Sequence, residues 1–136
     1  MAPQAHRNAE QAIVHIRSEA DLNAVRMFAR EACNLVGMRG YAAQKVVTAV
    51  SELARNIRRY VGEGLVRFQI DTDDNRITII AEDHGCGIAD IELVLSGKYR
   101  SRTGLGRGLL GAKNLADHFH IETGPQGTTV TLGFDF

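Results

Sequence analysis

The chain has 136 residues, of which 44% are hydrophobic and 24% charged, as expected of one globular domain with its own core. Its 16 basic residues balance 16 acidic ones, so the net charge gives no reason to expect a nucleic-acid or membrane partner. No apolar run approaches the roughly 18 residues that cross a bilayer, and the polar N-terminus lacks a signal peptide's apolar segment, so we expect a cytoplasmic protein.

The N-terminal part predicts a leader, a strand and a helix. Residues 1–11 are polar and are expected to be flexible, with a single domain over residues 12–136. Residues 12–17 alternate in polarity as a strand does. Ser18, with Asp21 three residues on, predicts the start of a helix over about 20–36, which Gly37 and Gly40 end. Its expected buried stripe is Leu22, Val25, Phe28, Ala29, Ala32, Leu35 and Val36.

A second helix is predicted over about 41–61. Three polar side chains, Glu52, Asn56 and Arg59, share a flank about 100–140° around from its apolar stripe. On this pattern alone, a solvated helix surface is the favoured interpretation of that flank. The expected buried stripe is Val46, Val50, Leu53, Ile57 and Val61.

The middle of the chain predicts two strands and a glycine-rich turn. Residues 65–71 and 76–82 are strand-like, and the turn-forming segment 72–75 between them predicts a hairpin. The turn follows as Asp83-His84-Gly85-Cys86-Gly87-Ile88. A short helix over 88–95, opened by Asp90, and a polar, basic, mobile loop over 96–102 are expected next.

The last third contains a second glycine-rich turn, a helix and a hairpin. Residues 104–108 alternate glycine with other residues, and a helical pattern that overlaps them runs over 105–119. Strands are predicted over 120–123 and 128–134, joined by Gly124-Pro125-Gln126-Gly127. Neighbouring strand pairs with helices between them predict an α/β sandwich (α+β), with a mixed, mostly antiparallel sheet and helices on one face.

Three separated segments contain the parts of a nucleotide site. Asp83 offers a carboxylate to an exocyclic amine such as that of adenine, and Asn56 offers an amide oxygen to Mg²⁺. The second turn and the helix start behind it suit phosphates. Lys98, Arg100 and Arg102 can neutralise charge during phosphoryl transfer. No Gly-Lys-Ser/Thr of a Walker A loop follows the glycines, and their spacing is wrong for a dinucleotide fingerprint.

At these residues the chain resembles the GHKL (Bergerat-fold, histidine-kinase-like) ATPases. Within them it resembles the small serine/threonine switch kinases of the anti-sigma-factor group, the RsbT-like kinases in particular. The resemblance covers about residues 12–134. It rests on the N-box Ser51–Ile57, the glycine boxes Asp83–Ile88 and Arg102–Leu109, and Gly127-Thr128-Thr129-Val130.

The resemblance implies ATP and Mg²⁺ as ligands and a STAS-domain protein as substrate, with a stressosome-type assembly as one setting. It gives Glu52 the role of general base, Asn56 that of Mg²⁺ ligand, Asp83 that of adenine reader and Arg102 that of contact to the terminal phosphate. The implied contacts to the nucleotide and its metal are Asn56, Asp83, Gly85, Gly87, Ile88, Arg102, Thr103, Gly104, Leu105, Gly106, Arg107, Gly108 and Thr128.

Several alternatives remain open at this point. The chain could instead be an anti-sigma factor or a phosphatase-activating binding module that uses ATP as a structural ligand, with a sigma factor or phosphatase as partner. The ATP-binding domain of a larger histidine kinase is disfavoured, since no phosphoacceptor histidine box is present. Cys86 stands where the family that the chain resembles often has proline or another small residue, and a small, inert side chain is favoured over a redox role. His118 and His120 lack a third ligand for a metal.

Overall fold

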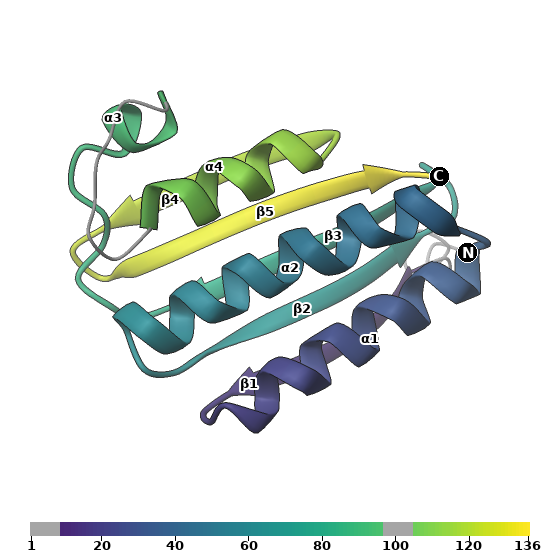
Figure 1. The fold of residues 1–136 in the computed structure, drawn as a ribbon, viewed down its shortest axis with the longest axis horizontal. Coiled ribbons are helices and arrows are strands. Elements are labelled where there is room, and N and C mark those ends of the chain that lie inside the picture. Colours follow the sequence, from purple (N-terminus) through teal and green to yellow (C-terminus); the bar gives the residue numbers. More distant parts are fainter. Residues whose placement is uncertain (1–8, 97–104) are drawn as a thin grey trace, which may run out of the picture.

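The protein is described by a computed structural model that covers residues 9–96 and 105–136. In these ranges the chain alternates strand pairs with helices, as the sequence predicts (Figure 1). The elements are β1 (Ala9–Ile16), α1 (Ala20–Val36), α2 (Gly40–Tyr60), β2 (Gly64–Asp71), β3 (Arg76–Asp83), α3 (Ile91–Leu95), α4 (Leu105–Leu115), β4 (His118–Gly124) and β5 (Gly127–Asp135).

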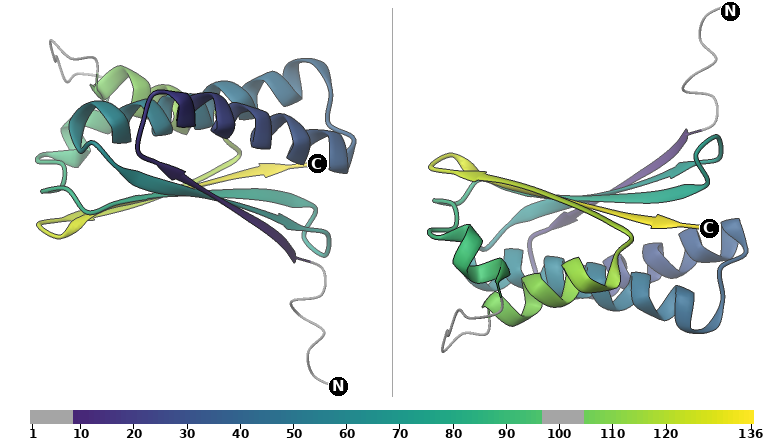
Figure 2. Two further views of the ribbon diagram at one scale, coloured as in Figure 1. Left: turned by 90° about the horizontal axis from the view of Figure 1, so that it is seen from below. Right: turned by 90° about the horizontal axis from the view of Figure 1, so that it is seen from above.

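The strands form one five-stranded sheet in the order β1-β2-β3-β5-β4, and every neighbouring pair is antiparallel. The helices lie together on one face of this sheet, which gives the molecule two layers (Figure 2). The predicted α/β architecture with helices on one face is therefore confirmed. The register places Asp83 opposite Thr128, so the last residue of β3 lies beside the start of β5 at one end of the sheet.

The core fills the space between the two layers. Alternate residues of β2 and β3 point towards the helices and are buried, because side chains along a strand alternate between its faces. The buried face of α2 lies over them, with Val46, Val50, Leu53 and Ile57 at 4% exposure or less. The predicted stripe of this helix is confirmed at these four positions, whereas Val61 follows the last helical residue and is 38% exposed.

Helix α1 has the predicted bounds, and Gly37 ends it in the left-handed region at φ +79°. Two residues of its predicted stripe are not in the core: Phe28 is 42% exposed and Leu35 is 58% exposed. Within the described residues the helix packs on β1, β2 and α2, and the ring of Phe28 stacks on that of Phe68 in β2 without being enclosed. Helical periodicity shows which side chains share a face, but the neighbouring elements decide how wide a face is covered.

The boundary between α4 and β4 differs from the prediction. The helix ends at Leu115, and the strand begins at His118, so Phe119 belongs to β4. Phe119 pairs with Leu132 of β5 in the ladder, and its partly buried side chain satisfies an inward strand position as well as a helical one. At the other end of the chain, β1 begins at Ala9, three residues before the predicted strand.

No helix among the described residues is both long enough and apolar enough to cross a membrane.

Candidate nucleotide site

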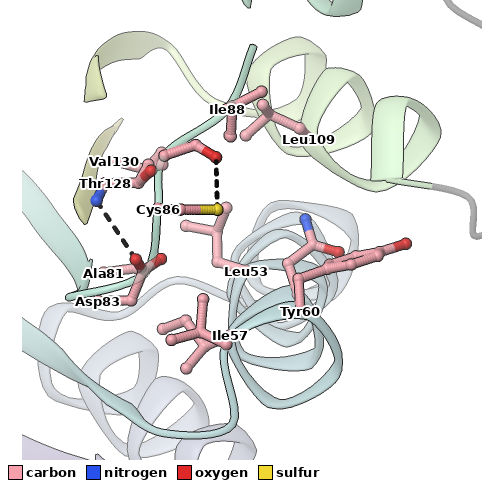
Figure 3. Close-up of a pocket in the computed structure, with 13 residues that line it drawn as sticks. Leu53, Ile57, Tyr60, Ala81, Asp83, Cys86, Ile88, Leu109, Thr128 and Val130 are labelled. Atoms are coloured by element: carbon pink, nitrogen blue, oxygen red, sulfur yellow. Dashed lines mark hydrogen bonds between the residues drawn. The ribbon is translucent and has the colours of Figure 1, made fainter. Parts of the chain in front are cut away.

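A cavity of about 280 Å³ lies between α2 and the end of the sheet at which β3 ends and β5 begins. Its walls are mainly apolar, and Asp83 and Thr128 lie on the side opposite α2 (Figure 3). The lining residues are Leu53, Asn56, Ile57, Tyr60, Val61, Ala81, Asp83, Cys86, Gly87, Ile88, Leu109, Thr128 and Val130. A mainly apolar cavity with a few convergent polar groups is typical of a small-molecule site.

Backbone hydrogen bonds hold the carboxylate of Asp83 at the end of β3. Its Oδ1 accepts from the backbone N–H of Gly85 at 2.9 Å and from that of Thr128 at 3.3 Å. Among the described residues, Oδ2 takes part in no hydrogen bond. The side chain is therefore fixed in orientation by one oxygen, while the other is available to a donor in the cavity.

A second hydrogen-bond chain joins the turn after β3 to the hairpin of β4 and β5. The hydroxyl of Thr123 accepts from the backbone N–H of Ile88 at 2.8 Å and lies 2.8 Å from the hydroxyl of Thr128. Sequence reasoning missed Thr123. The signal that could have found it is the hairpin register, which places Thr123 directly opposite Thr128.

Gly87 is required for the close packing of this turn. Its φ is +88°, a conformation that side chains disfavour, and an added Cβ would contact the carbonyl oxygen of Gly124. The first glycine-rich turn therefore packs directly on the backbone of the β4–β5 hairpin. Cys86, between the two glycines of the turn, is exposed and lines the cavity.

Glu52 and Asn56 project from α2 towards the first turns of α4. An added Cβ on Gly108 would lie 2.9 Å from Oε2 of Glu52 and 3.4 Å from Oδ1 of Asn56. The other oxygen of Glu52, Oε1, accepts a hydrogen bond from Arg55 at 2.6 Å. The carboxylate thus has one oxygen in an ion pair at the surface and the other directed at α4.

The structure brings together residues from three of the predicted segments. Asn56, Asp83, Gly87, Ile88 and Thr128 line the cavity, Gly85 donates to Asp83, and Glu52 lies beside Gly108 next to it. Gly106 and Gly108 lie in the first turns of α4, inside the predicted helix, so of the predicted glycine-rich turn they form the part that is helical. Arg102, Thr103 and Gly104 lie outside the described residues, as do Lys98 and Arg100, and so do the side chains of Leu105 and Arg107.

Apart from Ile88, the apolar side chains that line the cavity were predicted as core residues or carried no prediction. Leu53 and Ile57 belong to the buried stripe of α2, and Leu109 of α4 is 2% exposed. A side chain that faces an internal cavity has the same periodicity as one that faces packed neighbours. No sequence pattern separates the two cases, so these residues are identified by the structure alone.

The two histidines singled out from the sequence do not line the cavity, and neither does the second cysteine, Cys33. Cys33 is buried in the core, and burial raises the pKa of its thiol. His118 pairs with Asp135 at 2.9 Å, and the exposed His120 pairs with Glu122 at 3.2 Å. Within residues 9–96 and 105–136, no three histidine, cysteine or acidic side chains gather as metal ligands would.

The chain matches the model of the histidine kinase-like ATPase domain over residues 16–134. The serine/threonine-protein kinase RsbT of Bacillus subtilis (strain 168) is 37% identical over 116 residues, which cover 84% of this chain and 87% of that kinase. The anti-sigma F factor of Clostridium novyi (strain NT) is 35% identical over 95 residues, which cover 64% of this chain and 66% of that protein.

Among solved structures, the RsbU and RsbW domains of a Mycobacterium tuberculosis protein superpose with a TM-score of 0.64 at 20% identity. The superposition covers 91% of this chain but only 32% of the longer one. At this identity the likeness concerns the fold alone.

Proposed function

The chain belongs to the histidine kinase-like ATPase domain family, and on this premise we propose that it transfers the γ-phosphate of ATP to a serine or threonine hydroxyl of a STAS-domain regulator. Its homology to the RsbT kinase over most of both chains makes it a protein serine/threonine kinase of the partner-switching kind. The observation that carries the proposal is the position of Glu52 beside Gly108, next to the cavity that Asn56 and Asp83 line.

The lining residues fit an adenine nucleotide. Apolar side chains such as Leu53 and Val130 suit the faces of the base, and the free Oδ2 of Asp83 suits its exocyclic amine. Thr128 donates its backbone N–H to that carboxylate and also lines the cavity, and its hydroxyl lies 2.8 Å from that of Thr123. The phosphates would then extend towards the start of α4, where backbone N–H groups without helical partners favour anions.

Asn56 would hold Mg²⁺ through its amide oxygen, because this ion takes oxygen ligands. When bound, the ion neutralises charge on the phosphates and orients them. Arg102, Thr103 and Gly104 would complete the phosphate contacts in this proposal.

In the transfer step, the acceptor hydroxyl oxygen forms a bond to the γ-phosphorus while the bond from that phosphorus to the bridging oxygen of the β-phosphate breaks. The hydroxyl proton passes to Glu52, and ADP leaves. Since the reaction consumes ATP and acts on a regulator, we place it in the cytoplasm.

A second candidate is a binding module that sequesters a sigma factor or a phosphatase, with ATP as a structural ligand. The similarity to an anti-sigma F factor favours it, and the two activities are compatible on one surface. They differ in whether Glu52 is needed: phosphotransfer requires a base, whereas sequestration does not.

The test is a comparison of wild type with Glu52→Gln, which retains the size of the side chain and removes its basicity. STAS-domain proteins of the source organism serve as acceptors with labelled Mg-ATP. We expect phosphotransfer to fall by about 10²- to 10⁴-fold while the Kd for ATP changes little. Glu31→Gln on the exposed surface of α1 is the matched control and should behave as wild type.

Equal rates in Glu52→Gln and wild type would remove Glu52 from the role of base. Absence of phosphotransfer by the wild type, combined with ATP-dependent capture of a sigma factor or phosphatase, would favour the binding module.

A further inference from the structure

The exposed surface of α2 has an unusual distribution of charge. Glu52 is the sole acidic residue among the 21 of this helix, and Lys45, Arg55, Arg58 and Arg59 are its cations. The chain as a whole has 16 basic and 16 acidic residues, so this excess is a local segregation of charge. The acidic residue that we assign to catalysis therefore lies in a basic surface.

Two of these cations lie in line with Glu52. Lys45 is seven residues before Glu52, and Arg59 is seven residues after it. Seven residues complete almost two helical turns, so the three side chains form a stripe along one face with about 10 Å between neighbours. The stripe, defined as Lys45, Glu52 and Arg59, thus has a cation on each side of the base.

Among the residues that the structure describes, no acidic side chain neutralises the two cations of the stripe. Arg55 is paired with Glu52 and Arg58 with Glu19, but no ion pair involves Lys45 or Arg59 within the described ranges 9–96 and 105–136. Each instead lies over a tyrosine ring. The Lys45 ammonium is 5.2 Å from the Tyr41 ring centroid, and the Arg59 guanidinium is 5.8 Å from that of Tyr60.

Tyr41, beside Lys45, is 74% exposed. Tyrosine and arginine are enriched at the energetically important positions of protein interfaces, because they offer a large contact area at low entropic cost. Cations supported by rings are also held in place before a partner arrives. This end of the stripe therefore combines an unpaired charge with an uncovered aromatic surface.

We propose that this stripe is the docking surface for the phosphoacceptor protein, and that the acceptor presents acidic side chains on both sides of its serine or threonine. The inference rests on the proposed function, because the acceptor hydroxyl must reach Glu52. An acidic group about 10 Å to either side of that hydroxyl then faces Lys45 or Arg59. A neutral or basic surface would leave both cations desolvated and unpaired.

The test uses the full chain, Mg-ATP and a STAS-domain protein that the wild type phosphorylates. Two double variants change the stripe in steps: Lys45→Gln with Arg59→Gln removes both charges, and Lys45→Glu with Arg59→Glu reverses them. We expect KM for the acceptor to rise by about 5-fold in the first and by at least about 30-fold in the second, with kcat and the Kd for ATP nearly unchanged. Raising the salt to about 1 M should reduce the differences in KM between the wild type and the two double variants, because screening weakens exposed charge pairs.

The matched control is Lys113→Glu on α4. This cation is also exposed, but it lies about 140° around the helix from Gly108, which faces α2. Its KM for the acceptor should stay at the wild-type value.

Three results would overturn the proposal. An unchanged KM in the charge-reversal variant, with wild-type kcat, would show that docking occurs elsewhere and would leave the proposed function standing. An equal rise in KM for Lys113→Glu would show a general charge effect. If the wild type phosphorylates none of the STAS-domain proteins, the proposed function fails and the docking surface fails with it.

Discussion

The two halves of the site are built in different ways. The half around Asp83 and Thr128 is fixed by hydrogen bonds to backbone N–H groups and by close packing of the Gly87 turn on the β4–β5 hairpin. The half around Glu52 is a helix surface, where one exposed ion pair to Arg55 orients the carboxylate. An exposed pair of this kind contributes little to stability, so Glu52 is far less constrained than Asp83.

Under the proposed function, nucleotide binding and phosphoryl transfer would therefore have separate structural supports. In that proposal, the half that would bind adenine is already held in the chain alone, because its restraints are backbone groups of β5 and of the turn after β3. The half around Glu52 would be complete only when nucleotide and acceptor surround that side chain. Substitutions in the first half should therefore change affinity, whereas substitutions in the second should change rate.

The largest effect after loss of Glu52 itself is expected for Gly108→Ala. The added Cβ would lie 2.9 Å from Oε2 of Glu52 and would displace that flexible carboxylate. Because misplacement by about 1 Å can cost about 10²-fold in rate, we expect a fall of that order in phosphotransfer. The Tm should be unchanged or higher, since alanine is a better helix former than glycine.

Gly111→Ala is the control for this change. Gly111 lies in the same helix, and no described atom beyond its neighbours and its own helix backbone is within 4 Å of its added Cβ. It should have the wild-type rate, and its Tm should likewise be unchanged or higher. A wild-type rate in Gly108→Ala would show that the position of Glu52 is not constrained by α4.

The next effect is expected for Asp83→Asn, which tests the other half. Asparagine retains Oδ1 for the N–H groups of Gly85 and Thr128 but presents an NH₂ donor in place of the free Oδ2. A hydrogen bond to a charged group contributes about 1.5–3 kcal/mol, so the Kd for ATP should rise by about 10- to 100-fold. Isothermal titration calorimetry measures this Kd. The kcat at saturating ATP should change much less. A kcat that falls as far as affinity would contradict the separation of the two halves.

A smaller effect is expected for Thr123→Val. Valine retains the shape but leaves the backbone N–H of Ile88 without its partner hydroxyl, which costs about 1–3 kcal/mol of stability. Loosening of this turn should raise the Kd for ATP by about fivefold at most, a change smaller than that of Asp83→Asn. Thr131→Val, on the open face of the same hairpin, is the control, and chemical denaturation with a nucleotide titration compares the two.

The smallest effect is expected at the opposite end of the sheet. There the hydrogen bond from Arg76, followed by that from His118, lowers the pKa of Asp135 below its usual value of 3.8. A carboxylate with a lowered pKa in the folded state stabilises the protein above pH 3.8, and this contribution is lost as the pH falls further through the folded-state pKa. Asp135→Asn should therefore be slightly less stable than wild type near neutral pH.

That stability difference should disappear in acid, as unfolding curves measured across the pH range below 3.8 would show. Asp135→Asn should change neither the Kd for ATP nor the rate of phosphotransfer at neutral pH, because Asp135 is at the end of β5 remote from Thr128. A change in either would mean that the two ends of the sheet are coupled.

Much of the fold could be predicted from the sequence because it depends on local patterns. The bounds of α1, the hairpin of β2 and β3 and the antiparallel character of the sheet follow from periodicity and turn residues. The predicted family and kinase class are confirmed by the similarity to RsbT and by the domain model. The errors arose where two structures suit the same pattern, as for Phe119, which fits helix and strand equally well.

The residue types of the candidate site and their order could be read from the sequence alone: an acid and an amide on one helix, then two glycine-rich segments and a threonine. Spacing along one element is a local property, so Glu52 and Asn56 could be placed on one flank. Distances between elements are not local. Three contacts could be seen in the tertiary structure alone. Gly108 lies beside Glu52, and Thr123 links Ile88 to Thr128. Core-like side chains such as Leu109 line a cavity. These contacts arise because antiparallel pairing and helix packing bring together segments that are far apart in the chain.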